Sequence, residues 1–380
     1  MDLKTAKVAI VQDYLHVYGG AEAVVNAIWE LFPQADIYSA TYDAEVMKKA
    51  GVLQGARIFY PKWKDNIPGK FKKFAHKLLV ANLPFYFENL DLSQYDLIIS
   101  SSAHFAKGVK KTRENQIHVS YIHTPPRFLY GLPGEIRKRT NPVWKLILSP
   151  LDSYLRYKDK QFAQRPDYLL CNSETVKDRI KKYYNRDATV INPFPEITVS
   201  YADFEDSVKY GDYFLVISRL EAYKNVELII KTFSELGLPL KVAGKGSEYE
   251  NLLNLSKNYS NIEMLGYVSS EEKFDLLKKC KAFIIATEDE DFGMSALEPM
   301  MFGKPVIAYR SGGLKEIVKE KENGLFFDEL VSKSLGDALG RVQKIQFDSI
   351  SIRNYAQKFS KENFKNKFMN FLEDQISRHI

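Results

Sequence analysis

Two kinds of hydrophobic segment alternate along nearly the whole chain. Short apolar runs such as Lys7–Gln12 and Tyr213–Ser218 have the length and composition of buried strands. Longer segments between them carry apolar residues every three or four positions, as in Ala21–Phe32, which is the spacing of an amphipathic helix. This alternation predicts an α/β protein with doubly wound parallel sheets.

The alternation falls into two series separated by a weakly patterned, proline-bearing stretch at residues 192–211. We therefore predict a first domain over residues 1–199 and a second over residues 200–350. A basic, aromatic helix is expected over residues 351–380. Further strands are predicted at Ala35–Tyr42, Tyr95–Ser100, Ile117–Ile122, Tyr168–Asn172, Thr189–Ile191, Leu240–Ala243, Ile262–Leu265, Ala282–Ala286 and Val306–Ala308.

A junction between a predicted strand and a predicted helix carries two carboxylates eight residues apart. The helix is predicted to begin at Met294, so Gly293 lies where free N–H groups and the positive helix end favour an anion. Glu290 flanks that position from the loop. Glu298 can accept two hydrogen bonds at once, which suits a sugar or ribose diol. The alternative is a solvated acidic loop before an ordinary helix.

Two cations follow the first strand of the second series. Arg219 and Lys224 lie on a loop that leads into a helix predicted from Val226. Cations are unfavourable near a helix start, so their placement favours a function over a plain surface role. A guanidinium and an ammonium together can stabilise the negative charge that develops on a leaving diphosphate without a metal ion.

A double glycine follows the first strand of the first series. Gly19 and Gly20, preceded by Tyr18, allow the backbone to approach a ligand closely. The segment does not contain Gly-x-Gly-x-x-Gly, so it gives little support to a dinucleotide site. A simple turn remains the alternative.

The strand predicted at Ile117–Ile122 is followed by His-Thr-Pro-Pro-Arg-Phe. This places His123 and Arg127 at the carboxyl end of a strand, where doubly wound folds bind their ligands. A purely structural histidine is the alternative.

Together these motifs resemble the family 4 retaining glycosyltransferases of the GT-B class. The resemblance covers most of the chain and is strongest over Tyr213–Asp328, which also contains Ser311–Val318 and Asn323–Phe327. It implies two Rossmann-like domains that face each other across a cleft. It also implies that the C-terminal helix crosses back to the first domain.

The resemblance also implies a role for each motif. Arg219 and Lys224 would bind the diphosphate, Glu290 would orient the sugar, and Glu298 would bind the ribose. His123 would contact the transferred sugar. Because the leaving diphosphate itself takes the acceptor proton, no dedicated protein base, metal or cofactor is expected. The donor side further includes Gly19, Gly20, Gly293, Met294 and Ser295, and the acceptor side includes Tyr18 and Arg127.

Two departures from the family pattern bear on the donor pocket. Ser295 stands where many relatives carry proline, and Pro299 stands where relatives usually have alanine. A proline inside a helix removes an N–H group and can kink the helix, which puts the position of Glu298 in doubt.

Residues 123–128 and Ser100–Gly108 are similar to a subgroup of bacterial mannosyltransferases that build surface polysaccharides of the O-antigen type. The expected reaction is transfer of mannose from GDP-mannose to a glycan, expected to be lipid-linked. Three alternatives stay open. They are a UDP-sugar donor, a non-catalytic subunit that binds a nucleotide sugar, and a sugar-nucleotide epimerase.

The composition limits the cellular setting of the 380-residue chain. With 45% hydrophobic and 27% charged residues it is an ordinary globular sequence, and its net charge of +6 is a mild bias. Cys171 and Cys280 are far apart, as is typical of reduced thiols in a cytosolic protein. No signal peptide is evident, so we expect a cytoplasmic location.

Two further segments have competing interpretations. Asp289 and Asp291 form an Asp-x-Asp that could hold a metal ion, although the motifs above give a metal-free account. The segment Arg57–Leu79 interleaves cations with aromatic residues. It predicts either peripheral adsorption to the anionic inner face of the cytoplasmic membrane or a solvated helix face. No nucleic-acid-binding module is found.

Overall fold

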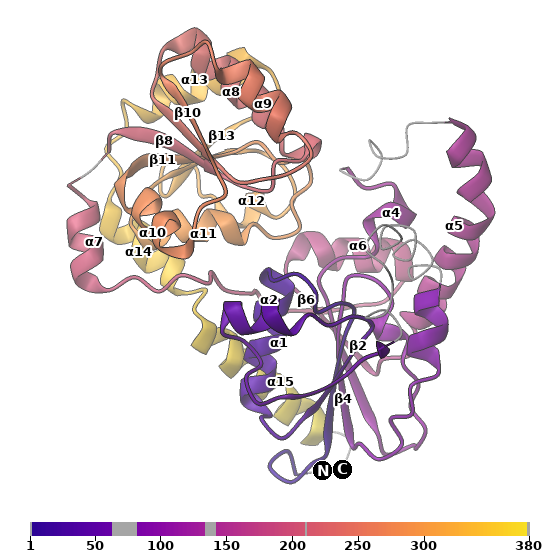
Figure 1. Ribbon diagram of the computed structural model, residues 1–380. Coiled ribbons are helices and arrows are strands. Elements are labelled where there is room, and N and C mark those ends of the chain that lie inside the picture. The colour runs from indigo at the N-terminus through magenta and orange to yellow at the C-terminus, as the bar shows by residue number, and fades with distance from the viewer. Residues whose placement is uncertain (1, 63–81, 134–141, 210, 378–380) are drawn as a thin grey trace. The chain divides into compact units, whose positions relative to one another are not determined.

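The computed structural model describes residues 2–62, 82–133, 142–209 and 211–377 (Figure 1). The chain divides into two compact units. Unit 1 comprises Met1–Gly131, Arg139–Pro193 and Lys361–Ile380, and unit 2 comprises Leu132–Lys138 and Phe194–Ser360.

Unit 1 is built on a seven-stranded parallel sheet. Its strand order is β3-β2-β1-β4-β5-β6-β7, and every residue of β1, β4 and β5 is buried, which explains their continuous apolar runs. The strands are β1 (Val8–Gln12), β2 (Asp36–Ser39), β3 (Arg57–Phe59), β4 (Leu97–Ser102), β5 (Ile117–Ile122), β6 (Tyr168–Cys171) and β7 (Thr189–Val190). The helices are α1 (Gly20–Leu31), α2 (Ala44–Ala50), η3 (Ala106–Gly108), α4 (Arg127–Tyr130), α5 (Pro142–Phe162), α6 (Glu174–Tyr184) and α15 (Lys361–Ser377).

Unit 2 has a six-stranded parallel sheet in the order β10-β9-β8-β11-β12-β13. Its strands are β8 (Tyr213–Ile217), β9 (Leu240–Ala243), β10 (Ile262–Gly266), β11 (Cys280–Ile285), β12 (Val306–Tyr309) and β13 (Gly324–Phe327). The helices are α7 (Tyr201–Ser207), η5 (Ala222–Lys224), α8 (Val226–Leu236), α9 (Tyr249–Ser256), α10 (Ser270–Lys279), α11 (Met294–Met301), α12 (Leu314–Ile317), α13 (Ser332–Val342) and α14 (Ser349–Gln357).

Successive strand residues of unit 2 enter different cores. Phe214 and Ile284 belong to one buried cluster, whereas their chain neighbours Leu215 and Phe283 belong to another. Because side chains alternate along a strand, both faces of the sheet are covered, as in a Rossmann-like domain. The prediction of two doubly wound α/β domains is confirmed.

Two strands of the sheets were not predicted from the sequence. β3 and β13 lie at sheet edges, and β3 has only three residues, two of them exposed. A short, exposed edge strand such as β3 needs no continuous apolar run, so its pattern is weak. Strand β13 is buried throughout but has only four residues, which is too short to show a period.

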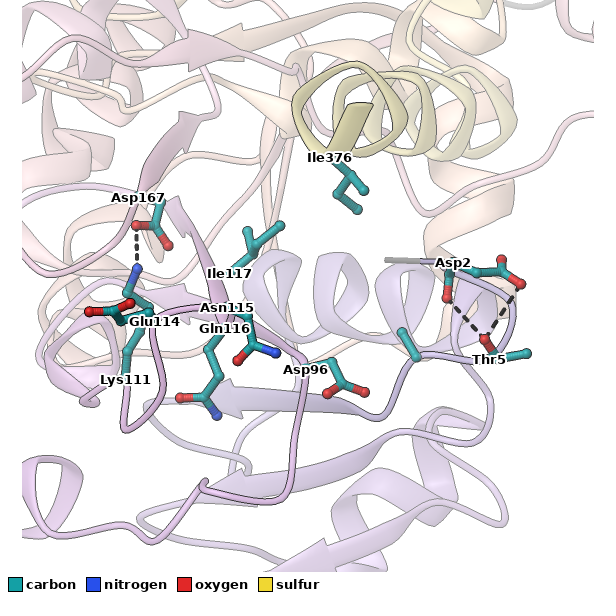
Figure 2. Close-up of a pocket in the computed structure, with 11 residues that line it drawn as sticks. Asp2, Thr5, Asp96, Lys111, Glu114, Asn115, Gln116, Ile117, Asp167 and Ile376 are labelled. Atoms are coloured by element: carbon teal, nitrogen blue, oxygen red, sulfur yellow. Dashed lines mark hydrogen bonds and ion pairs between the residues drawn. The ribbon is translucent and has the colours of Figure 1, made fainter. Parts of the chain in front are cut away.

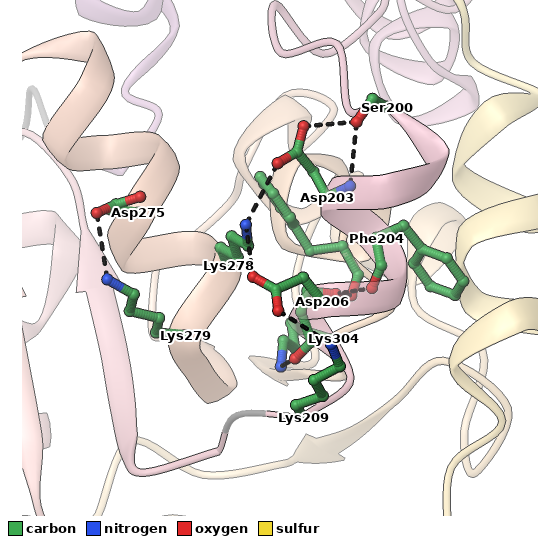
Figure 3. Close-up of polar contacts among 11 residues, drawn as sticks. Ser200, Asp203, Phe204, Asp206, Lys209, Asp275, Lys278, Lys279 and Lys304 are labelled. Carbon is green, nitrogen blue, oxygen red and sulfur yellow. Dashed lines mark hydrogen bonds and ion pairs between the residues drawn. The ribbon is translucent and has the colours of Figure 1, made fainter.

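The predicted linker contains a helix that packs on unit 2. Helix α7 is capped by Ser200, and Lys278 of α10 pairs with both Asp203 and Asp206, at 3.3 and 2.8 Å (Figure 3). Lys304 Nζ donates to the carbonyl of Ser207 at 2.6 Å. Residues 201–207 are therefore part of the second unit rather than irregular chain.

The C-terminal region forms two helices instead of the single one predicted over residues 351–380. Helix α14 packs against α11 of unit 2, and the chain turns before α15, which belongs to unit 1. Phe364 of α15 contacts the ring of Tyr121, and Phe371 contacts that of Tyr168, both with centroids 5.9 Å apart. No helix among the described residues is long and apolar enough to cross a membrane.

Candidate functional site

Loops that follow β8, β11 and β12 share the carboxyl edge of the unit 2 sheet. These three strands are direct neighbours and run parallel, so their carboxyl ends lie side by side. This edge is where ligands bind in doubly wound folds. Arg219 and Lys224 follow β8, Glu290 follows β11, and a glycine turn follows β12.

Lys224 and Glu290 form an ion pair across two of these loops. Lys224 Nζ lies 2.9 Å from Glu290 Oε2, and the two side chains are 16% and 21% exposed. Burial acts to lower the pKa of Lys224, but the charge of Glu290 opposes it and the pKa is raised overall. Lys224 is therefore protonated at neutral pH. The positive charge of Arg219 acts to lower the pKa of Lys224, so the two cations are near enough to interact. Two cations and one carboxylate therefore share this edge.

The glycine turn after β12 holds the Glu290 loop by its backbone. The N–H of Gly313 donates to the carbonyl of Glu290 at 2.8 Å, and Ser311 Oγ accepts from the N–H of Asp289 at 2.7 Å. Gly312 has a φ of +51°, and a Cβ there would lie 2.1 Å from the Glu290 carbonyl oxygen. Only glycine permits this approach, so the turn fixes where Glu290 lies.

A second pair of glycines, which the sequence interpretation missed, holds the Arg219 loop. The N–H of Leu220 donates to the carbonyl of Lys245 at 3.0 Å. A Cβ at Gly246 would lie 2.2 Å from the carbonyl oxygen of Leu220, and a Cβ at Gly244 would lie 1.8 Å from that of Ser218. The signal that could have identified them is Gly-x-Gly directly after the strand at Leu240–Ala243.

Helix α11 begins at the same edge. Gly293, with a φ of +103°, occupies the position before it, and a Cβ there would lie 2.9 Å from Leu314 Cδ2. Ala296 donates to the Gly293 carbonyl at 2.9 Å, so the N–H groups of Met294 and Ser295 precede the first helical hydrogen bond. Both residues are partly exposed. This first turn can accept an anionic group.

Glu298 lies deeper in α11 and is paired with a residue that the sequence interpretation did not include. Lys273 Nζ of α10 lies 2.5 Å from Glu298 Oε1. Burial raises the pKa of Glu298, and the charge of Lys273 opposes that rise. Pro299 follows within α11, which continues to Met301.

In unit 1, His123 is held at the carboxyl end of β5 by three contacts. Its N–H donates to the carbonyl of Ser102 at 2.9 Å, and its own carbonyl accepts from Asn172 Nδ2 at 2.9 Å. Its Nε2 lies 2.8 Å from Ser101 Oγ. Burial lowers the pKa of His123 to about 4, with Asp13 acting in the opposite sense. The imidazole is therefore neutral at pH 7, which suits hydrogen bonding to a hydroxyl.

The remaining predicted residues of unit 1 lie at the same edge of its sheet. Arg127 begins the short helix α4, and Tyr18 and Gly19 precede α1; all three are partly exposed. Gly19 has a φ of −169°, and a Cβ there would make only an ordinary contact, 3.5 Å from Glu22 Oε2. The chain itself therefore does not require glycine at position 19. Gly20 is the first residue of α1.

Asp13, also missed in the sequence interpretation, organises this edge. Its buried carboxylate accepts four backbone N–H groups, from Ala103, His104, Phe105 and Ala106, at 2.6, 2.7, 2.8 and 2.8 Å. The loop after β4 is thereby fixed to the end of β1, some 90 residues away. An aspartate directly after the first strand was the available signal.

A polar pocket of about 420 Å³ occupies the opposite, amino-terminal edge of the unit 1 sheet (Figure 2). Ile117, the first residue of β5, lines it, and Lys111 and Asp167 pair beside it at 2.6 Å. None of the predicted site residues lies there. Within the described residues, no group of three or more His, Cys, Asp and Glu side chains is placed to hold a metal ion. Asp289 and Asp291 therefore belong to no such group.

Comparison with known families gives one match in the second half of the chain. Residues 203–366 match the family described as Glycosyl transferases group 1. This segment contains β8 to α14 and therefore every predicted donor residue of unit 2, and it ends within α15.

Two related sequences illustrate the similarity. The uncharacterized glycosyltransferase MJ1178 of Methanocaldococcus jannaschii is 31% identical over 223 residues, which cover 56% of this chain and 62% of that protein. The O-antigen chain mannosyltransferase RfbU of Salmonella typhimurium is 26% identical over 228 residues, 58% and 64% of the two chains. Each match thus spans less than two thirds of the relative.

The fold resembles solved structures over its whole length. The crystal structure of Anabaena Alr3699/HepE in complex with UDP superposes with a TM-score of 0.70 at 17% identity, covering 97% of this chain and 100% of that one. The lipopolysaccharide outer core galactosyltransferase WaaB in its apo form gives 0.65 at 17% identity, with coverage of 97% and 99%. The architecture is that of the GT-B glycosyltransferases.

Proposed function

We propose that this protein is a retaining glycosyltransferase that transfers mannose from GDP-mannose to a glycan acceptor, expected to be lipid-linked. The observation that carries the proposal is the pairing of Lys224 with Glu290 beside the first turn of α11. This pairing supports the proposal because an ammonium group that could bind a diphosphate and a carboxylate that could bind a sugar lie at one edge of a Rossmann-like sheet.

The donor half of the reaction follows from the chemistry of these groups. Lys224 has three N–H donors, of which one is directed to Glu290, so the others can bind phosphate oxygens. With Arg219 it would stabilise the charge that develops on the leaving diphosphate. Glu290 would orient the sugar hydroxyls. Neither step requires a metal ion, so we expect transfer to continue in a chelator.

The acceptor half is assigned to the carboxyl-edge loops of unit 1. A neutral His123 has one ring nitrogen that donates and one that accepts, so it can hydrogen-bond to a hydroxyl of the transferred sugar without carrying a positive charge. The acceptor proton would pass to the leaving diphosphate on the same face of the sugar, which accounts for retention. Tyr18 and Arg127 are the proposed acceptor contacts.

Peripheral attachment at the inner face of the cytoplasmic membrane is also proposed, to bring the enzyme to a lipid-linked acceptor. Phe59 and Phe85 are 46% and 71% exposed, and both line an apolar cavity of about 610 Å³ in unit 1. They flank a cation-rich part of the sequence, most of which (residues 63–81) lies outside the described structure. Flotation with anionic and neutral vesicles tests this, since attachment predicts binding to the anionic vesicles only.

The donor has two candidates. Similarity to the mannosyltransferase RfbU supports GDP-mannose. The neighbour Alr3699/HepE was crystallised with UDP-glucose, which supports a uridine donor as the second candidate.

Calorimetry with GDP-mannose, UDP-glucose and UDP-N-acetylglucosamine in EDTA separates these donors. We expect binding of GDP-mannose, and release of free mannose or its transfer to an acceptor during turnover. Preference for a uridine nucleotide would overturn the donor but keep the reaction. Binding without any turnover would favour a non-catalytic subunit, and conversion of the donor to an epimeric nucleotide sugar without an acceptor would favour an epimerase. Binding of none would overturn the proposal.

A further inference from the structure

Lys273 and Glu298 form an ion pair between neighbouring helices of unit 2. The 2.5 Å contact joins Lys273 Nζ to Glu298 Oε1, while the side chains are 31% and 12% exposed. A partly exposed lysine thus covers one oxygen of a carboxylate that is otherwise nearly enclosed.

Burial and the paired lysine shift the pKa of Glu298 in opposite directions. Burial, the largest effect, and the charge of Glu196 both raise the pKa of Glu298. Lys273 alone among the described groups that act on Glu298 lowers it, through its charge and its hydrogen bond. The pKa of Glu298 stays above its ordinary value overall, and without this lysine it would rise further.

We propose that Lys273 is a positioning residue for the nucleotide sugar, which favours the ionised form of Glu298 by its ion pair with Oε1 and leaves Oε2 to accept from the donor ribose. This inference rests on the proposed function, because it assigns Glu298 to the ribose. An ionised oxygen accepts from both hydroxyls of a diol, whereas a protonated carboxyl group has to place a hydrogen atom of its own. Lys273 therefore acts through Glu298 and not through direct contact with the reacting atoms.

The proposal predicts a shift in the pH dependence of donor binding. Affinity for the donor should weaken as pH falls through the pKa of Glu298. In Lys273→Met that pKa rises further, so the weakening should begin at higher pH. A nucleotide sugar suits this measurement because its diphosphate is esterified at both ends and does not titrate near neutrality.

The test is calorimetry between about pH 5.5 and 8.5 with the donor that the wild-type protein binds among the three named above. We expect Lys273→Met to raise the Kd of the donor about ten-fold at neutral pH. This is the effect of losing a hydrogen bond to a charged group, here the bond from the ribose to the Glu298 carboxylate. Lys273→Arg should restore binding, and Glu298→Gln should remove the pH dependence. Lys279→Met is the matched control, since Lys279 lies on the same helix and pairs with Asp275 at 3.2 Å (Figure 3).

Three results would overturn the inference. The first is a Lys273→Met profile equal to that of the wild type. The second is a uniform loss of affinity at all pH values that Lys273→Arg does not restore and that accompanies a lower Tm. The third is a further shift caused by Lys273→Met in the Glu298→Gln background. If the wild-type protein binds none of the donors, the proposed function itself fails, which is a distinct result.

Discussion

The cations at the carboxyl edge of unit 2 differ in how firmly they are held. Lys224 is enclosed and paired with Glu290, and Lys273 is paired with Glu298. Arg219 is exposed at the surface of its loop. An exposed side chain contributes little to the stability of the fold. A large loss of reaction rate on removing Arg219 would therefore reflect a lost contact with the bound substrate.

Arg219→Ala is therefore expected to lower kcat about 10²–10³-fold, as removal of one charge-stabilising group from an active site does. The Tm should stay close to that of the wild type. Lys231→Ala is a suitable control, because it removes an exposed cation of unit 2 that pairs with Glu227 on helix α8. Turnover by Arg219→Ala near the wild-type level would exclude the diphosphate role.

At the scale of elements, glycine turns decide where the charged side chains lie. Glycines of the turn after β12 and of the loop after β9 approach the backbone of neighbouring loops at distances that exclude a Cβ. The position of Glu290 thus depends on Gly312, which is 22 residues further along the chain. The sequence interpretation missed the glycines after β9, and the contact between loops is a property of the assembled sheet.

Gly312→Ala should displace the Glu290 loop and lower donor affinity and rate. Gly237→Ala is the matched control: its φ of +66° is similar, but a Cβ there has nothing within 4 Å. Both variants should lose about 1–2 kcal/mol of stability from the left-handed backbone. Only Gly312→Ala should lose activity in a donor-hydrolysis assay. Equal activity of the two variants would contradict the role of this turn.

At the scale of the whole molecule, the two units differ in how they are assembled from the chain. Apart from residues 132–138, unit 2 is one continuous segment, whereas unit 1 includes α15 from the end of the chain. Four side chains on one face of α15, namely Phe364, Phe368, Leu372 and Ile376, are buried. Lys361 and Lys365 also pair with Glu30 of α1. Unit 1 therefore cannot form its full core without the last residues.

We expect residues 194–360 to fold when expressed alone and to bind the nucleotide donor. A fragment of residues 1–193 should be unstable, since each fully buried apolar side chain contributes about 1.5–3 kcal/mol. Adding α15 as a separate peptide should stabilise it. Circular dichroism melting curves of the three samples, with calorimetry of the donor fragment, check this. A cooperative melt of residues 1–193 alone, unchanged by the peptide, would refute the expectation.

The sequence by itself determined the fold class and most strands, and it singled out the residues that are proposed to bind the donor. It could do so because strand and helix periods are local, and because Arg219, Lys224, Glu290 and Gly293 lie in the segments that follow buried strands. The edge strands β3 and β13, the helix α7 and the break before α15 were beyond it, since tertiary packing decides them.

Only the tertiary structure decided which side chains act together. Asp13 with the loop after β4, Lys273 with Glu298, and Gly312 with Glu290 are partners that no periodicity relates. They meet because parallel strands bring the ends of distant segments to one edge of a sheet, and because helices α10 and α11 pack side by side. The physical reason is that the hydrophobic pattern around a residue indicates whether it is buried. The order of strands and helices in the fold decides which group a buried polar side chain contacts.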